Sequence, residues 1–276
     1  MSTAVALPTR PASRGASLRR ELGLVAWQVR YEQRAFWRNR ARSFFAFLFP
    51  IMFLVVFASL FSGHKLPGGG GISYNDFFVP GILAYGVIMT TFVNIAVSTA
   101  ILRDDGVLKR MQGTPLPRWA YLAGRIGSAI LITLAMTAVT LAFGSLAYGV
   151  RIPTTTLPGF ALALALGTAC FTTLGVGIVR FIGNAEAAPP IVNIAILPLT
   201  FISGIWFANQ EMPHWLREIA QLFPVHALAD AFQYAFDPRT VGLGIRVSDL
   251  KTLSIWLAVG VFLMIRFLRQ PLGEGG

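Results

Sequence analysis

The sequence predicts an all-α integral membrane protein with six transmembrane helices. Hydrophobic residues make up 55% of the 276 residues and charged residues only 13%, whereas an average soluble domain is about 25% charged. Apolar segments long enough to cross a bilayer recur along almost the whole chain, and they do not alternate in polarity as barrel strands would. These segments are residues 44–61, 79–101, 126–148, 157–178, 189–207 and 250–267.

Positive charge is divided unequally between the two sides of the predicted helices, and this predicts their orientation. Seventeen of the 23 Lys and Arg residues lie before the first segment, in the second-to-third and fourth-to-fifth connections, or at the end of the chain. Because Lys and Arg are retained on the cytoplasmic side, both termini are expected in the cytoplasm, which requires an even number of spans. The net charge of +11 is explained by this orientation and by contact of the basic residues with anionic membrane lipid. Nucleic acid is therefore not expected as a partner.

The residues before the first apolar segment fall into two parts. Residues 1–17 are rich in Ser, Ala, Pro and Arg and are expected to be a disordered tail. Residues 18–42 predict an amphipathic helix in the membrane interface; an ordinary cytoplasmic helix packed on protein is the alternative. The apolar face is formed by Leu18, Leu22, Val25, Val29 and Phe36, and the basic face includes Arg30, Arg34 and Arg38. Residues 43–268 then form the transmembrane domain, and 269–276 a C-terminal tail.

The most informative connection joins the second and third segments. Residues 103–119 are dense in charge and are interrupted by glycine and proline. Val107, Leu108 and Met111 are spaced to form the apolar face of one short helix. Such a compact helix suits contact with a soluble partner, whereas a solvated basic loop that only satisfies the charge rule is the alternative.

The sequence lacks the motifs of the common catalytic sites. It contains no GxxxxGK[ST] nucleotide loop, no HExxH zinc motif and no GxSxG elbow. With three histidines in connections and a single cysteine, Cys170, neither a metal site nor an intrachain disulfide is expected. Carboxylates are almost absent from the predicted spans, which disfavours a proton-coupled transporter. No catalytic residue and no cofactor bound by this chain are therefore expected.

Four sequence blocks carry a family resemblance. They are FFVPG at 77–81; Arg103, Asp104, Asp105 and Gly106, followed by Leu108, Lys109, Arg110, Thr114, Pro115 and Leu116; NAEAA at 184–188; and SGIWF at 203–207, followed by Met212, Pro213, Trp215, Leu216, Phe223 and Pro224. In this order and spacing, over residues 18–268, they resemble the ABC-2 type transporter permeases, which include daunorubicin-type drug exporters and polysaccharide exporters. Asp104, where the family usually has Glu, and Ala208, where it often has Pro, are departures.

The resemblance implies the partners and the energy source. It implies a second permease chain, identical or different, and a cytoplasmic ABC ATPase subunit that binds ATP and Mg. The loop at 104–116 would act as the coupling helix seated on that ATPase, and the segment from Met212 to Pro224 would form short re-entrant helices in the outer leaflet. The expected location is a bacterial inner membrane.

The expected function is export of a hydrophobic or amphipathic substrate, such as a drug, lipid or glycan, by alternating access. Residues proposed to line the substrate path are Met89, Phe92, Asn94, Asn193 and Trp206, although polar residues within spans are also explained by hydrogen bonding between helices. A secondary multidrug exporter and a membrane-embedded hydrolase are the alternatives. The second would need paired Glu/His or Ser/His residues within the spans, and the sequence offers none.

Overall fold

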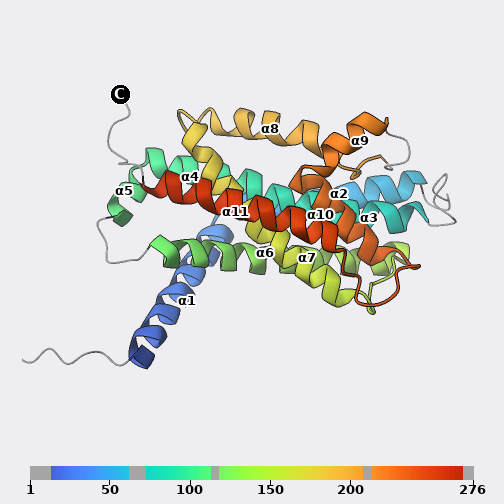
Figure 1. Ribbon diagram of the computed structural model, residues 1–276, viewed down its shortest axis with the longest axis horizontal. Helices are drawn as coiled ribbons and strands as arrows, with labels where there is room; N and C mark the ends of the chain where they lie inside the picture. The colour runs from blue at the N-terminus through green and yellow to red at the C-terminus, as the bar shows by residue number, and fades with distance from the viewer. Residues whose placement is uncertain (1–13, 62–72, 113–117, 208–212, 270–276) are drawn as a thin grey trace, which may run out of the picture.

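The computed structural model describes residues 14–61, 73–112, 118–207 and 213–269, and all secondary-structure elements in these ranges are helices (Figure 1). The elements are α1 (Arg14–Arg38), α2 (Arg40–Phe61), α3 (Tyr74–Ile88), η1 (Met89–Val93), α4 (Asn94–Asp104), α5 (Val107–Gln112), α6 (Arg118–Tyr148), α7 (Leu157–Ile178), η2 (Val179–Phe181), α8 (Ala188–Ile202), α9 (His214–Gln221), α10 (Pro224–Phe236) and α11 (Val247–Arg269). The predicted all-α class is confirmed for these residues.

Five helices in the described ranges are long and apolar enough to cross a membrane. They are Arg40–Phe61, Asp76–Asp104, Trp119–Tyr148, Leu157–Phe181 and Val247–Arg269. The fifth predicted segment differs, because α8 ends at Ile202 after 15 residues and so rises only about 22 Å. That length is short of the ~30 Å hydrocarbon core.

The bundle has two distinct ends (Figure 1). The end of α4, α5 and the start of α8 lie at one end, and α9 lies at the other. α8 therefore runs from the end that carries α5 towards the end that carries α9.

The helix α7 forms the centre of the bundle and packs along α11. Small residues allow this approach: a Cβ atom added to Gly260 would lie 2.4 Å from Oγ1 of Thr173, and one added to Gly177 would lie 2.7 Å from Cβ of Leu263. Such glycines let helix backbones come close in the absence of a hydrophobic driving force within lipid.

A π-helical turn, η1, interrupts the second long helix between α3 and α4. Thr91 Oγ1 donates to the Val87 carbonyl at 2.6 Å, and the α7 backbone passes so close that a Cβ on Gly175 would lie 2.8 Å from the Phe92 carbonyl oxygen. π-Helical turns within α-helices are frequent at functional sites. No sequence pattern predicted this one.

The helix α10 corrects the sequence analysis, which left its residues in a connection and expected short helices only up to Pro224. It is almost wholly buried among α3, α7 and α11. Phe232 and Phe236 lie 4.7 and 5.4 Å from the ring of Phe160 on α7. At 13 residues, α10 is too short to be recognised as a membrane span from the sequence, although tertiary packing buries most of it.

The helix α1 crosses the N-terminal half of α6 and projects from the bundle (Figure 1). Gln33 Nε2 donates to the Ser128 carbonyl at 3.0 Å, and Phe36 is only 2% exposed. The expected basic face is exposed at Arg30, Arg34 and Arg38. On the expected apolar face, Val25 and Val29 are half-buried, whereas Leu22 is exposed. Three aromatic side chains of α1 are also exposed: Trp27, Tyr31 and Trp37. One side of α1 thus packs on protein, while contact of the other with lipid stays a prediction.

Candidate functional site

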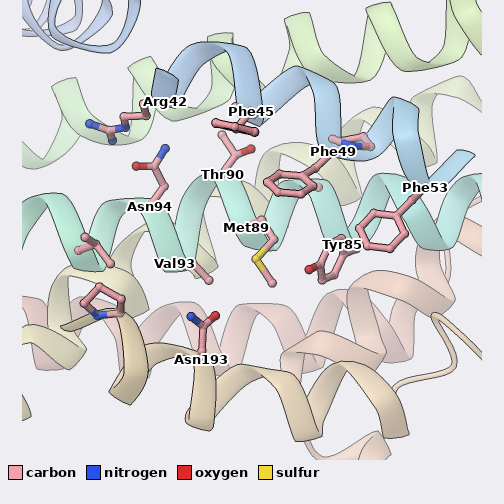
Figure 2. Close-up of a pocket in the computed structure, with 15 residues that line it drawn as sticks. Arg42, Phe45, Phe49, Phe53, Tyr85, Met89, Thr90, Val93, Asn94 and Asn193 are labelled. Carbon is pink, nitrogen blue, oxygen red and sulfur yellow. The ribbon is translucent and has the colours of Figure 1, made fainter. Parts of the chain in front are cut away.

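A cavity of about 560 Å³ opens between α2, the η1 region and α8 (Figure 2). The helix α2 contributes Phe45, Phe49 and Phe53, the η1 region contributes Met89, Thr90 and Val93, and α8 contributes Pro189 and Asn193. The π-helical turn therefore forms one wall. Pro50 in α2 also lines the cavity, and its ring leaves the Ala46 carbonyl without an intrahelical donor.

A second cavity of about 510 Å³ continues the first towards the end of the bundle that carries α9. The two cavities share Phe53 and Tyr85. Trp206 lies beside the shared wall, with its ring 5.3 Å from Phe53 and 5.2 Å from Tyr85. The remaining lining is mostly aromatic: Phe57, Phe61, Tyr74, Phe77, Phe78, Phe201 and Phe207, with Leu197 and Thr200. Together the cavities form one groove, called here the aromatic groove.

Polar groups gather at one end of the aromatic groove. Figure 2 shows Arg42 and Asn94 at the same end of the first cavity, with Phe53 and Tyr85 at the other. Neither cavity is lined by an Asp, Glu or Lys residue among those described. The groove thus combines one cationic, amide-bearing end with a long apolar, aromatic body.

The structure brings together four of the five residues expected in the substrate path. Met89, Asn94 and Asn193 line the first cavity, and Trp206 lines the second. Phe92 does not line either cavity: it is 7% exposed and packs edge-on against Phe171 of α7 at 6.5 Å. The π-helical turn explains this, because it rotates neighbouring side chains to different faces.

The sequence analysis missed the aromatic side chains of α2. Phe45 stacks on Phe49 at 5.5 Å, and Phe57 stacks on both Phe53 and Phe61 at 6.3 Å. The repeat of phenylalanine every four residues from 45 to 61 places these rings along one helical face, and this spacing is the signal that was available. Arg42, counted only as a topology signal, extends the same region by one turn.

The predicted coupling loop divides into an anchored part and an exposed part. Arg103 donates from Nη1 to the carbonyls of Val179 and Ile182, at 3.0 and 2.7 Å, and from Nη2 to that of Gly183 at 3.1 Å. Asp104 accepts a hydrogen bond from the backbone N–H of Ala185 at 2.6 Å. These two residues therefore fasten the end of α4 to the connection between α7 and α8.

The rest of the loop presents charged side chains to solvent. Asp105, Lys109 and Arg110 are exposed, whereas Leu108 is 4% exposed and faces the bundle. Gly106 has a φ of +67°, a left-handed conformation that glycine adopts without strain, and it turns the chain from α4 into α5. Thr114, Pro115 and Leu116 lie outside the described residues.

The predicted re-entrant segment corresponds to α9 and the start of α10. Trp215 is 63% exposed and Leu216 is half-buried. Phe223 stacks on Trp256 of α11 at 6.0 Å, while Pro213 precedes α9 and Pro224 begins α10. Met212 lies outside the described residues. The segment is helical, and its insertion into a membrane stays a prediction.

A charged cluster lies where α10 meets the start of α11. Arg246 forms ion pairs with Asp230 at 2.6 Å and with Asp249 at 3.7 Å. His226, one helical turn before Asp230, is 4% exposed, and its Nε2 has no hydrogen-bond partner. Burial lowers the pKa of His226 below its ordinary value, with Asp230 opposing and Arg246 adding to this shift. The cluster escaped the sequence analysis because these residues lie apart in sequence.

Similarity to known proteins agrees with this architecture. Residues 24–236 match the ABC-2 type transporter family. The chain is 22% identical to the inner membrane transport permease YadH of Escherichia coli strain K12 over 221 residues, which cover 79% of this chain and 80% of YadH. It is 28% identical to the daunorubicin resistance ABC transporter permease protein DrrB1 of Streptomyces coeruleorubidus over 189 residues, 67% of this chain and 64% of DrrB1.

A third relative is also named as a permease of an ABC transporter. The probable multidrug ABC transporter permease YbhR of Escherichia coli strain K12 is 25% identical over 166 residues, 58% of this chain and 43% of YbhR. These matches agree with the resemblance carried by the four sequence blocks. The chain belongs to the ABC-2 type transporter family and is a membrane permease of an ABC transporter.

Proposed function

We propose that this permease exports a hydrophobic or amphipathic substrate from the cytoplasm or inner leaflet by alternating access. The observation that carries the proposal is the aromatic groove, whose two cavities join at Phe53 and Tyr85. Concave, mostly apolar sites with a few polar groups are the usual form of small-molecule sites. Drug, lipid and glycan-linked lipid substrates all have this character.

A second permease chain would complete the groove on its open side. The helices α2 and α8 that border it expose large apolar side chains: Phe45, Phe49, Ile194, Leu197 and Phe201. Pairing these faces would enclose the substrate between two permease chains, identical or different. The transport energy would come from cytoplasmic ABC ATPase subunits that bind ATP and Mg, with α5 as the coupling helix.

The proposed topology has six crossings and both termini in the cytoplasm. α8 and the residues up to Phe207 would complete the fifth crossing, since α8 runs between the two ends of the bundle. α9 would lie in the outer leaflet, because Trp215, Ile219 and Leu222 are exposed. α1 would lie in the inner interface, where exposed Trp and Tyr side chains favour the headgroup region.

Reconstitution tests this function. The permease and its ABC ATPase are placed in inside-out vesicles with 11-(dansylamino)undecanoate or its neutral methyl ester as the amphiphile. Accumulation of either probe on ATP addition is expected, and an ATPase whose catalytic glutamate is replaced should abolish it. Met89→Trp, which fills the groove, should reduce accumulation, whereas Leu131→Trp on the exposed face of α6 should not. Accumulation driven by a proton gradient without nucleotide would contradict the proposal.

A further inference from the structure

We propose that the cytoplasmic end of the aromatic groove is an anion-binding position built on Arg42, so that the preferred substrate is an amphiphile with an anionic head. This inference rests on the proposed export function and names its substrate class. The shared head-group chemistry is a carboxylate or phosphate on an apolar chain.

The first observation is the unmet bonding capacity of Arg42. Its guanidinium lies at the end of the first cavity, 5.7 Å from the centre of the Phe36 ring. The Nε atom is buried without a hydrogen-bond partner, and no carboxylate among the described residues lies within 4 Å of the guanidinium. Arg42 as a whole is half-buried, and a buried donor of a cation that lacks an acceptor is costly; an anionic ligand would reduce that cost.

The second observation is a neighbouring buried arginine. Arg125 is 2% exposed, donates to the Tyr121 hydroxyl and, at 3.0 Å, to the Ser98 hydroxyl, and leaves its Nε unpartnered. Arg125 acts electrostatically on Arg42, and Glu32 is the one described carboxylate that acts on both. Two guanidiniums against one carboxylate leave this end of the groove positive.

The third observation is the composition of the groove. Asn94 offers a neutral amide beside Arg42, and Thr90 offers a hydroxyl one helical turn further along the cavity (Figure 2). The walls beyond them are mainly phenylalanine, methionine and valine, with Tyr85 and Asn193, and no acidic residue among those described lines either cavity. A cationic head would find no countercharge there, whereas a carboxylate or phosphate would accept charge-assisted hydrogen bonds from the guanidinium.

The experiment measures binding to the purified permease in a neutral maltoside detergent, without the ATPase. The probes are 11-(dansylamino)undecanoate, its neutral methyl ester and the analogue that ends in a primary amine. We expect the anionic probe to bind most tightly, and Arg42→Gln to weaken it about tenfold while leaving the neutral ester unchanged. Arg42→Lys should retain part of the preference, because the charge remains but the fork of donors is lost.

The matched control is Arg40→Gln, two residues away on the same helix and exposed. It should leave the affinity for all three probes unchanged. If Arg42→Gln weakened the binding of all three probes equally, the effect would be one of general packing, and the inference would be wrong. It would also be wrong if Arg40→Gln weakened binding of the anionic probe as much as Arg42→Gln does, because the effect would then be one of surface charge. Thermal unfolding of each variant shows whether a loss of binding arises from a less stable protein.

Added phosphatidylglycerol distinguishes the two sources of the anion. Displacement of the probe by this lipid in wild-type protein but not in Arg42→Gln would assign the position to a membrane lipid head group. Failure to displace would assign it to a free amphiphile, and both results support an anion site. Anion-selective binding without ATP-driven accumulation would contradict the export function and leave this inference standing. ATP-driven accumulation of all three probes without selectivity would contradict this inference and leave the export function standing.

Discussion

The Nη1 atom of Arg103 lies 2.7 Å from the carbonyl oxygen of Ile182, 79 residues further along the chain. This contact joins the helix that precedes α5 to the connection that precedes α8. Since α8 carries Pro189 and Asn193 into the aromatic groove, a displacement of α5 by a partner would reach the groove wall through this contact. Charge-assisted hydrogen bonds to backbone carbonyls are stronger than neutral ones, as the proposed coupling through this contact would require.

Replacing Arg103 should separate ATP hydrolysis from transport. Arg103→Gln removes the charge and most of the three bonds to Val179, Ile182 and Gly183, so we expect probe accumulation to fall at least tenfold while ATP hydrolysis by the partner continues. The nearby exposed Arg180 provides the control, and Arg180→Gln should transport normally. Equal transport by both variants would show that the contact carries no force.

The backbone at Gly106 should be sensitive to any side chain that resists a positive φ. A Cβ added there meets no atom within 4 Å, so the cost of Gly106→Ala arises from conformation alone, about 1 kcal/mol. Gly106→Asn should cost less, because Asn tolerates this region. Gly106→Pro, which forbids positive φ, should displace α5 and lower transport most. The measurements are thermal unfolding and coupled transport, with Gly183→Ala, also in open space, as the control.

Much of the architecture could be predicted from the sequence, and the parts that could not share a physical reason. Apolar length located five long helices because lipid demands it. α10 escaped because its 13 residues are buried by protein rather than by lipid, and η1 escaped because a π-helical turn leaves no periodic signature. Asn94 and Asn193 were found as polar residues within spans. Arg42 was counted only as one more charge in a connection, and its position at the cavity with a buried, unpartnered Nε atom depends on tertiary packing.

The close approach of α7 and η1 should not tolerate a methyl group. A Cβ on Gly175 would lie 2.8 Å from the Phe92 carbonyl oxygen and 3.2 Å from that of Thr91, and backbone cannot move aside as a side chain can. Overpacking of this kind costs about 1–3 kcal/mol, so Gly175→Ala should lower the midpoint of thermal unfolding. Gly23→Ala in α1, where nothing lies within 4 Å, should not. A midpoint for Gly175→Ala equal to that of wild type would refute the predicted packing.

The proposed orientation can be tested with single cysteines, because the natural Cys170 is buried and can be replaced by alanine. Val241→Cys, at a position 93% exposed between α10 and α11, should react with a membrane-impermeant maleimide in intact cells. Gly183→Cys, between α7 and α8, should react only after the membrane is opened. The reverse pattern would place the termini outside the cytoplasm.

Stability should depend on the protonation of His226. Its folded-state pKa lies below the ordinary value because burial disfavours the charged ring, so the unfolded state binds the proton more readily. The neutral ring therefore stabilises the fold fully above about pH 6.5, and this stability is lost as pH falls below that value towards the folded-state pKa. Arg246 pairs with Asp230 and Asp249 beside the histidine, so His226→Gln, which leaves these ion pairs in place, provides the reference. The midpoint of thermal unfolding is measured for wild type and for His226→Gln, and the difference between them should shrink or reverse as pH falls from 7.5 to 5. A difference that stays constant over that range would show that His226 does not titrate in the fold.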